Sequence, residues 1–404
     1  MTGLGSFGKL VRGARAARAR HAERRTPTGL GFALADGVDY LDGAAWDALT
    51  AGESVFLSRD YLRALSAAGP RNVQPRCALV YRGTKPVAAI AAQAVDAGAE
   101  RTVRKDCRKA RTLECLDARL LVCGNLLSWG LHGVAFAAGE DRAALWPAVA
   151  EALYRIRRAD KLFGDSDLIL VKDAPPERVG EVAALERFSF RALETEPNMV
   201  LELSPRWRTL DDYVQSLSSS YARAVRKTAK ELDAAGCTSE QATDVARVAD
   251  RLHALYLQVH EQQQVRLFTL TPEFLPALAA TLGERFRVSV VRRRGEIVAF
   301  ASTLRDGDTA VGYFLGFDKD AACELPLYLR LLHLSVADAI ALGCTRLSLG
   351  RTALEPKARL GAKPEPLRVF VRHRVPALNL LVRTLLGAIP HAEAPERDPF
   401  KRGA

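Results

Sequence analysis

Residues 286–351 constrain the fold of this chain most, because their short-range patterns leave few alternatives. Three runs have the pattern of strands, at 287–292, 296–304 and 309–317. Tight turns join them, and the Asp-Gly pair at 306–307 is a strong hairpin signal because glycine tolerates positive φ. An apolar helix follows, and then a fourth strand that ends in Gly350-Arg351. We therefore expect a three-stranded meander, a helix and a further strand.

A weak internal repeat indicates that the chain contains two such units. Residues 77–93 resemble residues 288–304, since each pairs two strands around a basic turn that contains glycine. Each is then followed by a helix and a short strand. The length of 404 residues also exceeds what one ordinary core supports. We expect a basic arm at 1–34, domains at 35–204 and 205–375, and an amphipathic tail at 376–404.

The net charge of +11 favours an anionic partner, which can be nucleic acid, a membrane surface or a phosphate-bearing substrate such as a coenzyme A thioester. Residues 1–25 hold seven of the basic residues against Glu23 alone, so much of the charge belongs to a terminal arm. Leu4, Phe7 and Leu10 have helical spacing within it. The arm is therefore either an interfacial helix on anionic lipid or a solvated basic segment.

The seven cysteines are scattered and form no CxxC pair, so we expect neither a bound metal nor a redox dithiol. Reduced core thiols are typical of a cytoplasmic protein. No secretory signal follows the first basic residues, and no uncharged run is long enough to span a membrane. The sequence thus predicts a cytoplasmic protein, with association on the inner face of the membrane left open.

Other segments predict the remaining elements. Closing strands are expected at 188–193 and 198–203, and helices at 243–262 and 271–282, the second capped by Thr271-Pro272. The helix at 219–235 exposes Arg223 and other cations, which either meet a phosphate-bearing ligand or are simply solvated. The leucine-rich face of a helix at 375–390 can pack on the protein body or lie in a bilayer interface.

Several motifs in the second half resemble the GNAT superfamily of acyltransferases. They are S-x-x-x-R at 219–223, the helix with Tyr256, LTPEF at 270–274, GEIVAF at 295–300, GYFLGFD at 312–318, LYLRLL at 327–332 and LGRTALEPKARLGA at 349–362. More specifically, these motifs resemble the bacterial GNAT-like group related to the FemAB peptidyltransferases. Members of this group place two such domains in tandem. This resemblance implies an α/β (α+β) fold of tandem GNAT-like domains, with mixed central sheets flanked by helices.

The resemblance also implies where the site lies. In GNAT folds two strands diverge, here 308–317 and 345–349, and backbone groups exposed there hold the pantetheine arm of an acyl-CoA. Transfer to an amine needs a base and a polarised carbonyl. The candidate catalytic residues are Tyr313, Asp318, His260 and Glu261, and the candidate substrate-binding residues are Arg351, Lys357, Arg223 and Tyr256. Structural alternatives remain, since Tyr313 can be core, Asp318 can close a turn, and Arg351 and Lys357 can be solvated.

The segment at 318–328 departs from the pattern of GNAT enzymes that use acetyl-CoA. Those enzymes carry a glycine-containing loop whose amides bind the pyrophosphate. Here the segment has no glycine and contains Asp318, Asp320 and Glu324. The FemAB-related group also lacks the loop, so acyl-CoA or acetyl-CoA is the expected co-substrate but the donor stays open.

Three functions remain open at this point. The first is N-acyl transfer from an acyl thioester to a small-molecule or lipid amine, such as a sphingoid amine at an anionic membrane surface. The second is FemAB-like aminoacyl or peptidyl transfer from aminoacyl-tRNA to a cell-wall precursor. The third is a non-catalytic membrane-binding or nucleic-acid-binding protein on the same fold. Aromatic residues make up only 7% of the chain, and no aromatic-basic stacking platform is evident.

Overall fold

The computed structural model describes residue 22 and residues 26–97, 119–162, 164–263, 266–387 and 394–401. Most of the predicted basic arm lies outside these residues, including the helical pattern at 4–11. We call the described residues up to 204 the first half and those from 205 onward the second half.

Two sets of strands form the sheet. The first half contributes β1 (Gly31–Ala35), β2 (Val73–Arg82), β3 (Lys85–Asp96), β4 (Arg119–Cys123), β5 (Val134–Phe136), β6 (Leu168–Ala174) and β7 (Arg191–Glu202). The second half contributes β8 (Cys237–Gln241), β9 (Phe286–Arg293), β10 (Glu296–Asp306), β11 (Thr309–Phe317), β12 (Arg346–Ser348) and β13 (Lys363–His373). The predicted meander therefore corresponds to β9, β10 and β11.

Helices connect and cover these strands. In the first half they are α2 (Gly43–Thr50), α3 (Arg59–Ala68), α5 (Arg142–Ala159) and α6 (Pro176–Val182). In the second half they are α7 (Leu210–Ser216), α8 (Ser219–Ala234), α9 (Ala249–His260), α10 (Phe274–Leu282), α11 (Lys319–Glu324), α12 (Leu327–Ala341), α13 (Leu354–Ala358) and α14 (Pro376–Gly387). Short 3₁₀ turns precede or follow several of them.

The two halves repeat one arrangement, as the internal similarity predicts. The hairpin β2–β3 matches the hairpin β9–β10, and both have two-residue turns. In the first half α5 leads from β4 to β6, which pair in parallel. In the second half α12 leads from β11 to β12, which also pair in parallel. The expected fold of mixed sheets flanked by helices is confirmed.

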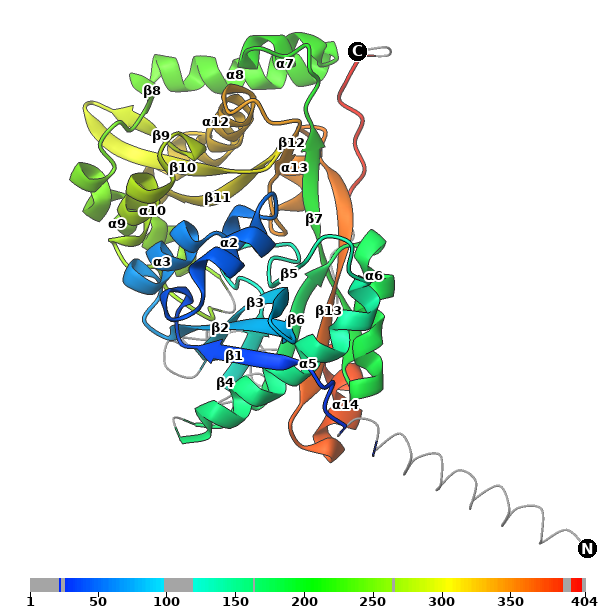
Figure 1. Cartoon of the computed structure of the whole chain (residues 1–404). Coiled ribbons are helices and arrows are strands. Elements are labelled where there is room, and N and C mark those ends of the chain that lie inside the picture. The colour runs from blue at the N-terminus through cyan, green and yellow to red at the C-terminus, as the bar shows by residue number, and fades with distance from the viewer. Residues whose placement is uncertain are drawn as a thin grey trace, which may run out of the picture.

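One mixed sheet joins the halves because their last strands are exchanged. Its order is β1-β2-β3-β4-β6-β13-β7-β12-β11-β10-β9-β8, and β5 pairs with β3. Strand β13 of the second half pairs with β6 of the first, whereas β7 of the first half pairs with β12 of the second. Figure 1 shows β7 and β13 side by side between the two parts of the sheet.

Helices on the two faces of the second-half sheet place its side chains. Helix α12 packs on one face of β9, β10 and β11, with α7 and α8 outside it. Helices α9 and α10 lie on the other face, toward α2 and α3 of the first half (Figure 1). A single apolar cluster spans this contact and includes Trp46, Phe56 and Tyr61 with Leu255, Phe274 and Phe300. The halves therefore share a core as well as a sheet.

Several boundaries differ from the sequence-based expectations. The strands expected at 188–193 and 198–203 are one strand, β7, because a bulge between Thr195 and Asn198 accommodates Pro197 without ending the pairing with β13. Helix α10 begins at Phe274, and the Thr271 hydroxyl donates a hydrogen bond to the Ala68 carbonyl instead of capping it. The helix expected at 243–262 is shorter, since a 3₁₀ turn at Ala246–Val248 precedes α9.

The end of the chain returns to the body. Helix α14 packs on β7 and β13, and Val382 is buried there. Further on, Phe400 pairs with Leu217 and stacks on Trp207, so residues 394–401 lie against α7. Among the described helices, none combines the length and the apolar character that crossing a membrane requires.

Candidate active site

Strands β11 and β12 diverge soon after they meet, as the resemblance implies. Their parallel pairing covers only three positions, from Thr309 with Arg346 to Val311 with Ser348. Strand β11 then continues to Phe317 without β12. A bulge bends it here, and the Ser302 hydroxyl both donates to the Phe314 carbonyl and accepts from the Phe314 amide, each at 2.9 Å. At the bulge, Tyr313 reaches Tyr61 of the first half, and Phe314 packs against Tyr256 of α9. We call this region, where side chains of the two halves meet, the junction.

The first half has an equivalent divergence at the same junction. Strands β4 and β6 pair up to Cys123 and Val171 and then separate. Gly124 follows Cys123 directly and Asp173 lies two residues after Val171, and both have positive φ, of 127° and 61°. The loop at 124–133 fills the space between the two pairs of diverging strands. Its Asn125 and Ser128 side chains are buried.

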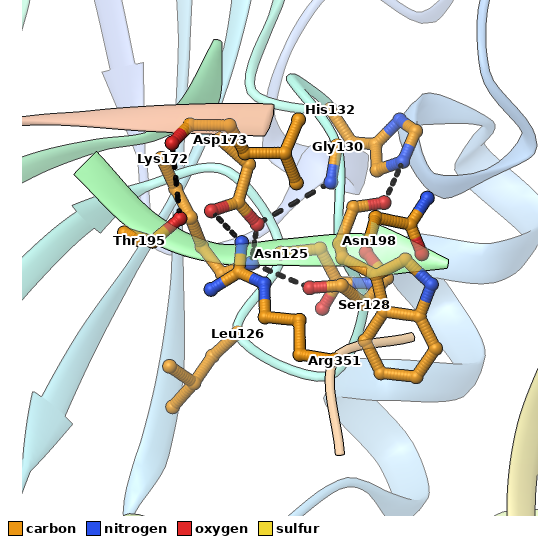
Figure 2. A network of polar contacts seen from close by, with 12 residues as sticks. Asn125, Leu126, Ser128, Gly130, His132, Lys172, Asp173, Thr195, Asn198 and Arg351 are labelled. Carbon is orange, nitrogen blue, oxygen red and sulfur yellow. Dashed lines mark hydrogen bonds and ion pairs between the residues drawn. The ribbon is translucent and has the colours of Figure 1, made fainter. Parts of the chain in front are cut away.

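Asp173 is the centre of a buried ionic group (Figure 2). Its carboxylate accepts from Lys172, from Arg351 and, at 3.3 Å, from the Gly130 amide. Lys172 also donates to the Ser128 carbonyl. Burial alone would raise the pKa of Asp173, but the two cations outweigh it and hold that pKa below its ordinary value. Burial lowers the pKa of Lys172, and Arg351 acts in the same direction against the attraction of Asp173.

A second set of hydrogen bonds fixes the turn that carries Arg351. The Asn198 side-chain oxygen, on β7, accepts from the Ser348 hydroxyl and the Gly350 amide, both at 3.0 Å. The Trp129 indole donates to the Ser348 hydroxyl at 2.8 Å. Gly350 has a φ of 79°, and a Cβ there would lie 2.7 Å from the Trp129 ring. The turn therefore needs glycine, and loop 124–133 holds it against β7.

Tyr313 is hydrogen-bonded across the junction. Its hydroxyl lies 2.7 Å from that of Tyr61 on α3, and Asn125 donates to Tyr61 at the same distance. Burial raises the pKa of both phenols above the ordinary value, so both are neutral at physiological pH. Tyr313 can therefore donate a proton or a hydrogen bond, whereas acting as a phenolate base would be costly.

Lys357 lies in α13 and is only 4% exposed. Burial lowers its pKa to about 7, against the opposing effect of Glu196 on β7. Glu196 is two residues from Asn198, the β7 residue that accepts hydrogen bonds from the turn before Arg351. An amine with this pKa can either accept or donate a proton near neutral pH.

His260 and Tyr256 form a separate group on α9. Their rings stack with centroids 4.9 Å apart, and Tyr256 packs edge-on against Phe314 of the bulge. Burial, with repulsion from Arg266, lowers the pKa of His260 to about 4, so the imidazole is neutral at pH 7. Its Nε2 lies 3.3 Å from the Thr269 hydroxyl. Glu261, one residue on, is exposed.

Two other candidates lie away from the divergence. Asp318 caps α11, accepting from the Ala321 amide at 3.1 Å, and lies 3.6 Å from Arg251. The segment expected as a loop at 318–328 is thus partly helical, and the Asp318 carboxylate accepts from its Ala321 amide while the Gln258 side-chain oxygen accepts from its Lys319 amide. Arg223 is exposed on α8, which packs on α12, across the sheet from His260.

The junction therefore brings together Tyr313 and Arg351 from the predicted set, whereas Lys357 is buried in α13, which packs on β7. Sequence reasoning missed the residues that hold them there: Tyr61, Asn125, Ser128, Trp129, Lys172, Asp173 and Asn198. A signal was present in the apolar run at 168–171, which ends directly in Lys172-Asp173, a charged pair at the end of a buried strand. A second signal was the group of Gly124, Asn125 and Ser128 after the strand that became β4.

Comparison with known proteins supports this architecture. A model of the acetyltransferase (GNAT) domain matches residues 219–358. The crystal structure of FemX is 11% identical, with 86% of this chain and 98% of FemX covered at a TM-score of 0.55. A tandem GNAT protein from the clavulanic acid biosynthesis pathway is 12% identical, with 86% and 99% covered at a TM-score of 0.50. No curated protein matches the sequence. Residues 219–358 therefore form an acetyltransferase (GNAT) domain, and the whole chain has the tandem fold of these two solved structures.

Proposed function

We propose that this acyltransferase moves an acyl group from an acyl thioester to an amine at the junction of the two halves. The observation that carries the proposal is the divergence of β11 and β12, with buried polar and ionic groups at its mouth. In the described residues, no strand pairs with β11 on the β12 side beyond Val311. Its backbone groups there suit an extended donor arm, which would bind as an added strand does.

The reaction forms a C–N bond and breaks the C–S bond of the thioester. The amine nitrogen attacks the carbonyl carbon and loses a proton, and the leaving thiolate gains one. Tyr313 is a neutral phenol at the bulge and suits the donation of that proton or a hydrogen bond. Lys357 suits removal of the proton from the amine. The roles predicted for Asp318, His260, Glu261, Tyr256 and Arg223 stay predictions.

One observation favours a second donor class. Where a coenzyme A pyrophosphate would need free amides before α12, Asp318 already caps α11, and Asp320 and Glu324 add negative charge. An aminoacyl ester, as on aminoacyl-tRNA, does not need this diphosphate cradle. The same attack by an amine would then break a C–O bond in place of a C–S bond. Aminoacyl transfer is therefore the alternative.

A lipid amine is the acceptor we favour, because α14 presents an apolar surface. Leu378, Leu380 and Leu381 are 46%, 69% and 50% exposed. Asp165 pairs with Arg157 of α5 and with Arg374 just before α14, which places the basic end of α5 beside this surface. Exposed leucines beside cations suit the inner face of an anionic membrane, and they support a peripheral cytoplasmic location.

The donor is tested by supplying both classes to the full chain. One arm of the assay supplies acyl-CoAs with short, medium and long acyl chains, and the other supplies a set of aminoacyl-tRNAs. Each donor is offered with sphingoid, aminolipid and small amine acceptors. Mass spectrometry of the amide product identifies the donor class. Amide from the CoA arm supports the proposal, amide only from the tRNA arm supports the alternative, and no amide from either arm overturns both.

The membrane surface is tested by flotation with vesicles of anionic or zwitterionic lipid. We expect the double variant Leu380→Glu/Leu381→Glu to lose binding to anionic vesicles. Leu329→Glu on α12 is the matched control, because Leu329 is also exposed, at 38%. Equal flotation of the double variant and the natural chain would count against the membrane role.

A further inference from the structure

We infer that Arg351, Lys172 and Ser128 form a binding site for an anionic group, a phosphate or a carboxylate, on one of the substrates. This assignment rests on the proposed function only for the identity of the substrate, because the site itself can be probed without turnover. In this site, residues of both halves contact the same ligand. Arg351 comes from the second half, and Lys172 and Ser128 come from the first.

The charges at this point of the junction do not balance. Two cations, Lys172 and Arg351, contact the single carboxylate of Asp173, which is only 1% exposed. One positive charge is therefore left over in a largely buried place. An uncompensated charge away from water is costly, so the site gains when an anion supplies the missing charge.

Two hydrogen-bonding atoms beside this charge also lack partners within the described residues. They are the Ser128 hydroxyl and the Arg351 Nε, both buried. Ser128 is only 2% exposed, so water cannot freely replace a missing partner there. Lys172 donates to the carbonyl of this same serine, which places the hydroxyl near the cations. In Figure 2 the side chains of Arg351 and Lys172 converge on Asp173, with Ser128 nearby.

The Arg351 side of the site is accessible to solvent. The Arg351 side chain is 24% exposed, although its Nε is buried. A guanidinium presents a planar set of donors that matches the oxygens of a phosphate or a carboxylate. The hydrogen bonds of Asn198 and Trp129 hold the turn of Arg351, so the guanidinium is positioned before the ligand arrives. A rigid donor set of this kind suits recognition better than a solvated arginine does.

The direct test measures anion binding by the full chain. The thermal midpoint of unfolding is followed against inorganic phosphate, acetate and chloride at matched ionic strength. We expect phosphate or acetate to raise the midpoint in a saturable way, because a ligand of the folded state stabilises it. Saturation by phosphate alone identifies a phosphate-bearing substrate, and saturation by acetate identifies a carboxylate. No saturable effect beyond chloride would overturn the inference.

Variants assign the binding to these residues. Ser128→Ala removes the unpaired hydroxyl without breaking a described side-chain bond, and we expect about ten-fold weaker anion binding, as for a hydrogen bond to an ionised group. Arg351→Gln should lose saturable binding altogether. Lys363→Gln, at an exposed lysine on β13, is the control for a lost positive charge and should bind as the natural chain does. Unchanged binding in Ser128→Ala and Arg351→Gln would refute the site.

The inference and the proposed function fail in different ways. If anions bind and the variants lose them, the site stands even when no donor yields an amide. If a donor does yield an amide but Ser128→Ala leaves the KM of every substrate unchanged, the proposed function stands and the site is refuted. Where both hold, Ser128→Ala raises KM for the anionic substrate alone, whereas the control Lys363→Gln leaves the KM of every substrate unchanged.

Discussion

At the scale of single residues, burial decides what the candidate side chains can do. The sequence leaves open that Lys357 is a solvated lysine, but in the structure it is buried and burial lowers its pKa to about 7. The pKa of Tyr313 shifts in the opposite direction, because burial raises it and keeps the phenol neutral. The same physical cause thus makes the amine available as a base and the phenol available only as a donor.

Replacing Lys357 with methionine should change how stability depends on pH. The folded protein releases this proton near pH 7, but the unfolded chain keeps it up to the ordinary value of 10.5. Between these values the unfolded state binds more protons, so the free energy of unfolding of the natural chain rises with pH. The variant lacks this rise and should be more stable below pH 7, by on the order of 5 kcal/mol.

The free energy of unfolding of the variant and of the natural chain is measured with denaturant from about pH 6 to about pH 10, the range over which the lysine titrates. Lys363→Met, at an exposed position, is the control and should leave the pH dependence unchanged. A constant difference between Lys357→Met and the natural chain across this range would show that the lysine is not perturbed. In an activity assay, the inflection of kcat/KM near pH 7 should disappear in the Lys357 variant.

Replacing Tyr313 with phenylalanine separates chemistry from packing. The ring stays, and the hydrogen bond to Tyr61 is lost, so stability should fall by about 1–3 kcal/mol. Tyr61→Phe breaks the same bond from the other side and is the matched comparison. We expect activity to fall about 100-fold or more only in Tyr313→Phe, as for a lost proton donor. Equal losses in the two variants would mean that Tyr313 is structural.

At the scale of elements, the close packing of α9 on β11 positions the group at Tyr256 and His260. Gly316 makes this approach possible, because a Cβ there would lie 2.4 Å from the Tyr256 amide nitrogen. The bulge at Tyr313–Phe314 then bends the same strand toward the first half. Strand β11 therefore packs on α9 at Gly316 and reaches the first half at Tyr313.

Gly316→Ala should force α9 away from β11. Backbone atoms cannot give way as a flexible side chain can, so we expect a loss of about 1–3 kcal/mol in the free energy of unfolding. Gly312→Ala in the same strand is the matched control, because its nearest neighbours would lie at 3.5 Å, an ordinary contact. Denaturant unfolding of both variants checks this, and equal stability of the two would contradict the packing argument.

At the scale of the whole molecule, the exchange of β7 and β13 makes each half depend on the other. Each half without its partner lacks a strand beside its parallel pair, which exposes a sheet edge as well as the shared core. The junction is therefore a fixed part of the structure, and the groups from both halves that meet there are held in one geometry. A site built across it does not require closure of two independent domains.

Separate expression of residues 1–204 and 205–404 tests this dependence. Neither fragment should show a cooperative unfolding transition alone, and the two expressed together should form a complex with one transition. Circular dichroism during heating distinguishes these outcomes. A cooperative transition in either fragment by itself would indicate that the strand exchange is dispensable.

The sequence alone determined the elements whose signals are local. Helix α3 begins at Arg59 after the Ser58 cap and ends at Ala68, and both its cap and its apolar face are short-range features of the sequence. The hairpin turns placed β9, β10 and β11 for the same reason. The element order then sufficed for the fold, and it also located the divergence of β11 from β12.

Only the tertiary structure decided the partners of these elements. Strand β13 was not predicted, since Pro364 and Pro366 mask its pattern and its neighbours are distant in sequence. Asp173 and Arg351 are 178 residues apart, and Tyr61 and Tyr313 are 252 apart. Local propensity carries no information about such pairs. Their meeting depends on the exchanged strands, and the charge left over at the junction follows from that meeting.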